Sequence, residues 1–191
     1  MSGLLIGLIV IVLIVVVLIA WVIGLYNSLQ RRKLNAENAW SDIDVQLKRR
    51  HDLIPNLVST VKGYAEHEKS TFDAVTQARA AAVGANGIAE QAGAENMLTQ
   101  ALGKMFAVAE AYPDLKANTN FLNLQEELTS TENKIGFARQ HYNRSVNQFN
   151  EATKTFPSNI IAGSFGFTEM DFFELDEAEA AQVKQAPKVE F

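Results

Sequence analysis

The chain has 191 residues, of which 48% are hydrophobic and 20% are charged, and its formal net charge at pH 7 is −5. This composition is sufficient for one domain of ordinary size with an appended segment. The sequence contains no cysteine, which excludes disulfides, thiolate nucleophiles, cysteine-ligated zinc and iron–sulfur clusters. The acidic balance argues against general nucleic-acid binding, because that function needs a basic surface.

The N-terminal stretch predicts a transmembrane anchor over residues 1–27. From Gly3 to Leu25 the sequence has no charged and no strongly polar side chain. As a helix this stretch is roughly 34 Å long, which is enough to cross a hydrocarbon core of about 30 Å with some tilt. A cleaved signal peptide is the alternative. A signal peptide fits less well, because no basic segment precedes the apolar stretch and because the stretch is longer than the apolar region of a signal peptide.

The residues after the apolar stretch predict how it meets the membrane. Trp21 and Tyr26 are amphipathic rings of the kind that favour the headgroup level. Arg31, Arg32 and Lys33 follow directly, and we expect this cluster to touch the lipid bilayer. Because no basic residue precedes the span, the positive-inside rule predicts a cytoplasmic soluble part. An extracytoplasmic location is the alternative, since a dedicated export route overrides this rule.

The chain from residue 28 to 157 predicts an all-α fold. Apolar residues recur at intervals of three and four from Trp40 to Ala65, and no glycine or proline interrupts residues 25–54, so the membrane helix should continue into the bundle. We expect further helices over 68–83 and 95–112. A long helix from about 116–120 to Phe156 has a period near 3.5, which is typical of coiled-coil packing. The expected architecture is an elongated antiparallel bundle of three or four helices.

The C-terminal residues predict a strap and a tail. Residues 158–175 are apolar and aromatic without a clear period, so we expect them to pack on the bundle or on a partner. Residues 176–191 begin with acidic side chains and contain Pro187, which predicts a mobile tail. Two glycines spaced four apart in the span favour close helix approach. Together with the strap aromatics they are the possible oligomer contacts: Gly3, Gly7, Phe165, Phe167, Phe172 and Phe173.

The titratable residues do not predict an enzyme. His51, His67 and His141 lack metal-ligand spacing to one another, and no glycine-rich phosphate loop is present. Acidic residues on long amphipathic helices are mostly solvated or form pairs between helices, whereas catalysis needs groups that converge in a cleft. We therefore predict no catalytic residues, no cofactor, no metal and no small-molecule substrate.

The stretch RRHDLIPNLV from Arg49 to Val58 combines charges with a proline inside a helical pattern. Pro55 has no amide hydrogen to donate to the His51 carbonyl, so a kink and a free acceptor are expected. The nearby charges are either ordinary surface residues, a ligand site or a polar layer between helices that fixes their register. In the polar layer, Arg49 or Arg50 would pair with Glu132, and Asp52 with Arg139. Tyr142 and Asn143 belong to the same polar set.

Several motifs resemble the LemA family. They are YNSL from Tyr26, AWSDIDVQLKRRHDLIPNLVSTVKGYAEHE from Ala39, YPDLKANTNFLNLQEELTSTENKIGFARQHYNRSV from Tyr112, and FPSNIIAGSFGF from Phe156. The resemblance covers about two thirds of the chain. It implies a bacterial protein anchored through an N-terminal span, with long antiparallel helices and no established catalytic residues. One branch of the family is linked to magnetosome formation. The tail after Glu174 has no family pattern, so nothing is transferred there.

These observations lead to a functional hypothesis. We expect a non-enzymatic, single-pass scaffold protein of the bacterial inner membrane that self-associates into a homo-oligomer. The alternative is a membrane sensor or adaptor that relays a signal through the continuous helix to a heterologous protein partner.

Overall fold

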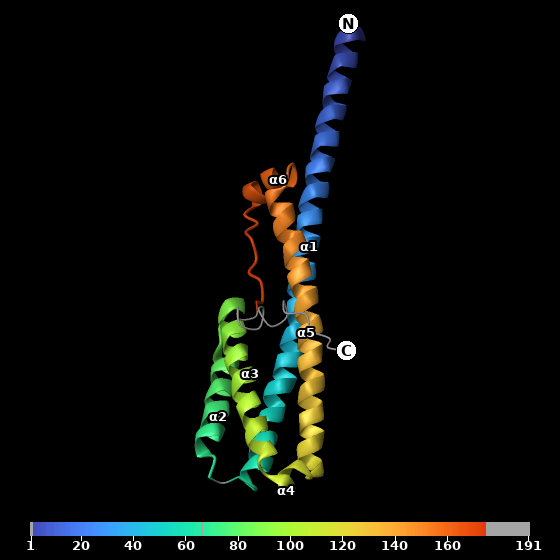
Figure 1. Ribbon diagram of the computed structural model, residues 1–191. Coiled ribbons are helices and arrows are strands. Elements are labelled where there is room, and N and C mark those ends of the chain that lie inside the picture. Colours follow the sequence, from blue (N-terminus) through green and yellow to red (C-terminus); the bar gives the residue numbers. More distant parts are fainter. Residues whose placement is uncertain (1, 66, 175–191) are drawn as a thin grey trace, which may run out of the picture. The chain divides into compact units, whose positions relative to one another are not determined.

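The computed structural model describes residues 2–65 and 67–174, and every regular element in them is a helix. The elements are α1 (Ser2–Lys62), α2 (Lys69–Gly84), α3 (Ile88–Glu110), α4 (Pro113–Lys116), α5 (Thr119–Lys154) and α6 (Ser158–Phe165). Figure 1 shows them in chain order. The predicted all-α fold is confirmed, with helices that pack on one another. The tail predicted for residues 176–191, and residue 175 of the strap, lie outside the described residues.

The described chain divides into two compact units, which we treat separately. The anchor unit comprises residues 2–39 and 141–170, and the bundle unit comprises residues 40–140 and 171–174. The chain passes from the anchor unit to the bundle unit within α1 and returns within α5. The boundaries expected from the sequence after residues 27 and 157 stay predictions.

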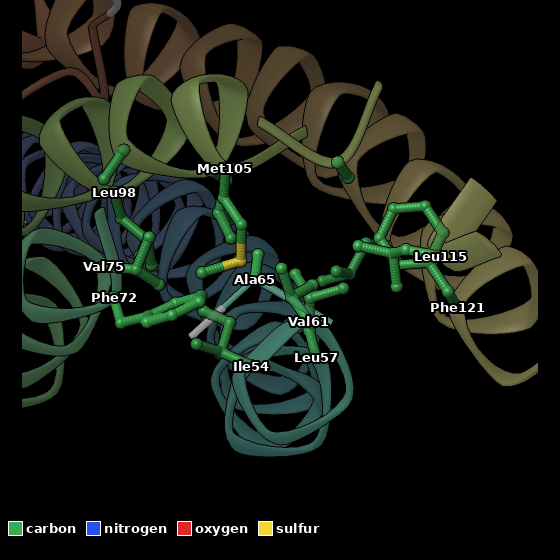
Figure 2. Packing of buried hydrophobic residues seen from close by; sticks show 14 of the residues in the cluster. Ile54, Leu57, Val61, Ala65, Phe72, Val75, Leu98, Met105, Leu115 and Phe121 are labelled. Carbon is green, nitrogen blue, oxygen red and sulfur yellow. The ribbon is translucent and has the colours of Figure 1, made fainter. Parts of the chain in front are cut away.

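The bundle unit has one apolar core, built from α1, α2, α3, α4 and α5. In α1 the buried side chains follow one another at alternating steps of three and four, as the sequence periodicity predicts. Figure 2 shows how Met105 of α3 and Phe72 of α2 meet the α1 residues of this core. Its largest fully buried members are Ile54, Leu57, Leu98, Met105, Leu115, Val61 and Val75.

The turns of the bundle unit have local causes. Gly87 precedes α3 with a φ of 90°, a left-handed conformation that glycine adopts without steric cost. Asn118 caps α5, because its side-chain oxygen accepts a hydrogen bond of 3.1 Å from the Phe121 amide. The same Asn118 side chain donates to the Tyr64 hydroxyl at 2.9 Å. This links the start of α5 to the segment that follows α1.

In the anchor unit, α6 packs beside α1 (Figure 1). Leu29 of α1 is buried against Ile161 and Ala162 of α6. α6 ends at Gly166, whose φ of 74° is left-handed, and the Phe167 amide donates back to the Ala162 carbonyl at 3.0 Å. This is a common glycine-dependent helix end. The predicted strap therefore begins as a helix and continues as an irregular segment.

Candidate functional site

The bundle unit buries two charged side chains at positions where its helical spacing predicts apolar ones. Arg50 lies three residues after Leu47 and four before Ile54, and it is only 3% exposed. Glu95 of α3 precedes the buried Leu98 by three and is 4% exposed. Each therefore occupies a seam position of its helix, that is, a position in the row of side chains, spaced three and four apart, that faces the other helices. A buried charge needs a partner and further hydrogen bonds to be tolerated.

Arg50 has three partners from two other helices. Its Nη1 atom lies 3.4 Å from Glu95 Oε2 and 3.1 Å from Glu132 Oε2 of α5. Its Nη2 atom donates to Thr99 Oγ1 at 2.6 Å. Glu132 is half-exposed, whereas Glu95 is buried. One guanidinium thus connects α1 with α3 and α5.

The second oxygen of the Glu95 carboxylate is also occupied. His51 Nε2 lies 2.7 Å from Glu95 Oε1, and Gln91 Nε2 donates to the same oxygen at 2.9 Å. Gln91 Nε2 additionally donates to the Ala82 carbonyl near the end of α2, at 3.0 Å. Because both carboxylate oxygens are engaged within the protein, this buried group is satisfied without solvent.

The structure also explains how Pro55 is tolerated. α1 continues as one helix from Ser2 to Lys62 with Pro55 inside it. The carbonyl that this proline cannot serve is that of His51. It accepts a hydrogen bond of 2.7 Å from Nε of Arg79, which lies on α2. The acceptor freed in α1 therefore becomes an attachment point for α2.

We call this set the Arg50–Glu95 network. Its members are Arg50, His51, Arg79, Gln91, Glu95, Thr99 and Glu132. It joins α1 to α2, α3 and α5 within the bundle unit. Chemically, it can fix the register of these helices, because one-residue slippage of any helix would leave a charge buried without its partner.

A shallow groove borders the network. Its volume is about 260 Å³, and its walls include the apolar side chains of Leu102, Phe106 and Leu128 beside Arg50 and Glu132. Cofactor and ligand pockets usually measure roughly 300–1,000 Å³, so the groove is below that range. Within the described residues, no group of three or more His, Asp or Glu side chains is arranged to hold a metal ion.

The other predicted polar-layer residues are distributed more widely. Arg49 pairs with Glu127 of α5 at 3.0 Å, and both side chains are about half-exposed. Asp52 is exposed, and Arg139 is partly buried on α5. Tyr142 and Asn143 fall in the anchor unit, where Tyr142 is fully buried.

The predicted membrane and oligomer residues lie as follows. Gly3 and Gly7 have open space around them. Trp21 is half-exposed and Tyr26 is partly buried, while Arg31 and Arg32 are exposed. Arg32 Nη1 donates to the Gln148 carbonyl at 3.3 Å, and Lys33 forms an exposed pair with Glu37.

The strap aromatics separate into exposed and packed side chains. Phe165 is 57% exposed and Phe172 is 37% exposed. Phe167 is partly buried, and its ring lies 5.5 Å from the ring of Tyr26. Phe173 is buried, with its ring 5.4 Å from that of Trp40.

Sequence reasoning missed Glu95, Thr99, Gln91 and Arg79. The sequence nevertheless contains a usable signal. Apolar seam residues of α1 recur every three or four positions, except between Leu47 and Ile54, where Arg50 fills the gap. Glu95 fills the same place at the start of the α3 seam. Opposite charges at two interrupted seam positions indicate that both side chains are buried, but not that they pair with each other.

The family comparison agrees with the motifs. The LemA family model matches residues 39–191, which is most of the chain. The chain belongs to the LemA family. The resemblance inferred from the sequence motifs is thereby confirmed.

Characterised relatives are distant. Protein LemA of Metamycoplasma hominis is 28% identical, over 84% of this chain and 74% of its own. Magnetosome protein MamQ of Magnetospirillum gryphiswaldense is 25% identical, over 78% of this chain and 64% of its own. Magnetosome protein MamQ 2 of Paramagnetospirillum magneticum is 25% identical over 82% of this chain and 67% of its own. The chain thus spans less than two thirds of the Magnetospirillum gryphiswaldense relative.

One helix in the described residues is long and apolar enough to cross a membrane, and it lies near the N-terminus. Most side chains of its apolar stretch are not covered by other parts of the chain. Leu4, for example, is 85% exposed and Ile23 is 53% exposed. This helix and the family assignment together support a membrane-associated helical protein with a single anchoring pass.

Proposed function

We propose that this LemA-family protein is a non-enzymatic scaffold that is tethered to the bacterial inner membrane and self-associates there, with its bundle unit in the cytoplasm. The non-enzymatic part of this proposal is supported by the Arg50–Glu95 network, whose buried polar groups bind other groups of the protein. Its two buried charges, Arg50 and Glu95, pair with each other, and their remaining polar atoms bind side chains of the same unit. The residues that most resemble a reaction centre therefore serve the helix register.

Exposed apolar side chains of the bundle unit support self-association. Phe137 on α5 is 72% exposed, Val45 on α1 is 63% exposed, and Met97 on α3 is 55% exposed. Single exposed apolar residues are normal on a protein surface, so their role needs a direct test. Relatives are named as magnetosome proteins, which supports a membrane-linked role for this chain.

Disulfide crosslinking can test the role of these side chains in self-association without background, because the sequence contains no cysteine of its own. Single cysteines replace Phe137, Val45 or Met97 in the full-length chain, and intact membranes are oxidised. The scaffold proposal predicts a disulfide-linked homodimer from at least one of these positions. Glu126→Cys, at an exposed polar position of α5, is the matched control and should crosslink less.

If none of the apolar positions crosslinks while a membrane-permeant maleimide labels all of them fully, self-association through this unit is refuted. Recurrent crosslinks to one heterologous protein at stoichiometric yield would favour the adaptor alternative instead. The feature that favours that alternative is the continuity of α1, which runs without a break from the apolar stretch to Lys62.

A further inference from the structure

The anchor unit contains a second apolar surface beside the membrane span. No charged residue occurs from Thr155 to Thr168, a stretch that includes the whole of α6. Ile160 is 58% exposed, Phe165 is 57% exposed, and the preceding Phe156 is 79% exposed. We call these three residues, two of which lie on α6 and one just before it, the α6 apolar face, as a name for the set. Three exposed large apolar side chains within ten residues, with no charge among them, are the composition expected of a segment that contacts an apolar environment.

The level at which α6 meets α1 identifies that environment. The residues of α1 that pack around α6 include Val22, Leu25, Tyr26 and Leu29. The first two belong to the last turn of the apolar stretch, and Tyr26 follows it. Over these residues α1 rises about 10 Å, which is comparable to the headgroup layer of roughly 5–8 Å on each side of a bilayer. α6 therefore lies beside the end of the apolar stretch of α1 (Figure 1). In a chain anchored through this stretch, that end is the part that reaches the membrane interface.

Two sets of contacts hold α6 at this level. The ring of Tyr26 lies 5.0 Å from that of Phe165 and 5.5 Å from that of Phe167. After α6, the backbone of Met170 is bound at both its amide and its carbonyl by the buried Asn150 side chain, at 2.9 Å each. The helix is thus fixed to α1 on one side and to α5 by the segment that follows it.

We propose that α6 is a membrane-interface helix, and that the α6 apolar face enters the boundary between headgroups and acyl chains. Interfacial helices bury an apolar face about 5–10 Å deep at this boundary. The lipid is the favoured occupant because α6 packs beside the end of the apolar stretch of α1 and because the segment from Thr155 to Thr168 carries no charge. Arg31 and Arg32, one turn beyond Tyr26, are placed to meet anionic headgroups.

Site-specific fluorescence quenching in lipid vesicles tests the proposal. Trp21 and Trp40 are the tryptophans of the chain, so Trp21→Phe with Trp40→Phe gives a silent full-length background. Ile160→Trp or Phe165→Trp is added to this background. Each protein is reconstituted in phosphatidylcholine–phosphatidylglycerol vesicles whose acyl chains are brominated near the carboxyl end.

The matched control is His141→Trp, an exposed position on α5 in the same unit. It lies roughly 20 Å along α5 from Lys154. We expect bromolipid to quench the tryptophans at 160 and 165 at least about twofold more strongly than the one at 141. Aqueous iodide should show the opposite order. A Trp40→Phe protein that keeps Trp21 is the positive control for the span.

Each result decides between occupants. Strong iodide quenching at both 160 and 165, with Trp21 quenched by bromolipid, would overturn the proposal while leaving the anchor intact. Protection of both positions from both quenchers would also overturn it, because it would place a second copy of the chain on the α6 apolar face. Two independent probe positions, each checked for helical content by circular dichroism, keep the test decisive if one substitution disturbs folding.

Discussion

Arg50 and Glu95 are charged residues at seam positions, and their energetic contributions should differ from those of surface pairs. Replacing a buried ion pair with apolar residues is often neutral, whereas removal of one partner leaves an uncompensated charge. The two carboxylates that meet Arg50 provide a natural comparison, since Glu95 is buried and Glu132 is half-exposed.

Glu95→Ala should lower the free energy of unfolding by about 3–5 kcal/mol, because it leaves buried Arg50 and His51 without their shared partner. Glu132→Ala should cost no more than about 1 kcal/mol, since its carboxylate is partly solvated. Urea unfolding of the full-length protein in detergent, followed by circular dichroism, measures both. Equal losses for the two variants would contradict the burial argument.

Pro55 and Arg79 should be energetically coupled through the His51 carbonyl. Arg79→Ala leaves this carbonyl unsatisfied, which should cost about 1–3 kcal/mol. In a Pro55→Ala background the new amide at position 55 can donate to the same carbonyl, so the cost of Arg79→Ala should fall by about 1 kcal/mol. A double-mutant cycle on the same unfolding assay measures the coupling. If the losses in the free energy of unfolding from the two substitutions simply add, Pro55 and Arg79 are not coupled through the His51 carbonyl.

At the scale of elements, the seam of α5 is the feature that positions the bundle core. Leu128→Asp should destabilise the protein by several kcal/mol, because an unpaired carboxylate would enter a site that is 5% exposed. Leu122→Asp is the matched control on the same helix, at 45% exposure, and should change stability little. Thermal melting of both variants checks the assignment. A Leu128→Asp protein that melts like wild type would refute it.

Periodicity was sufficient to predict the long helices, but not the short α4 and α6, the start of α3 or the contacts between helices. The long α5, the end of α3 before Pro113 and the continuation of the span into α1 all follow from spacing and proline positions. The pairing of Arg50 with Glu95 depends on which helices lie side by side, which local patterns do not encode. Arg79 could not be found at all, because its acceptor is a backbone carbonyl rather than another side chain.

The C-terminal strap illustrates a second limit. Its apolar residues have no clear period because different side chains meet different surroundings. Ile161 packs on α1, Ile160 is exposed, and Phe173 is buried against Trp40 of the bundle unit. A sequence pattern that serves an α1 contact, an exposed face and a core contact within a few residues cannot show one periodicity.

At the scale of the whole molecule, the basic cluster after the span predicts the side of the membrane. If the bundle unit is cytoplasmic, a single cysteine at Val83, which is 59% exposed, should resist a membrane-impermeant maleimide in intact cells and react after lysis. A cysteine facing outward would react in both conditions. Labelling in intact cells would therefore contradict the positive-inside assignment and favour an extracytoplasmic bundle unit.

A scaffold requires that several copies of this LemA-family chain assemble in one membrane. Its most direct test is the mass of the full-length protein extracted together with its surrounding lipid, measured particle by particle by mass photometry. For a scaffold we expect particles that contain several copies of the 21.1 kDa chain and no second protein. Particles that hold a single copy at micromolar concentration would contradict it.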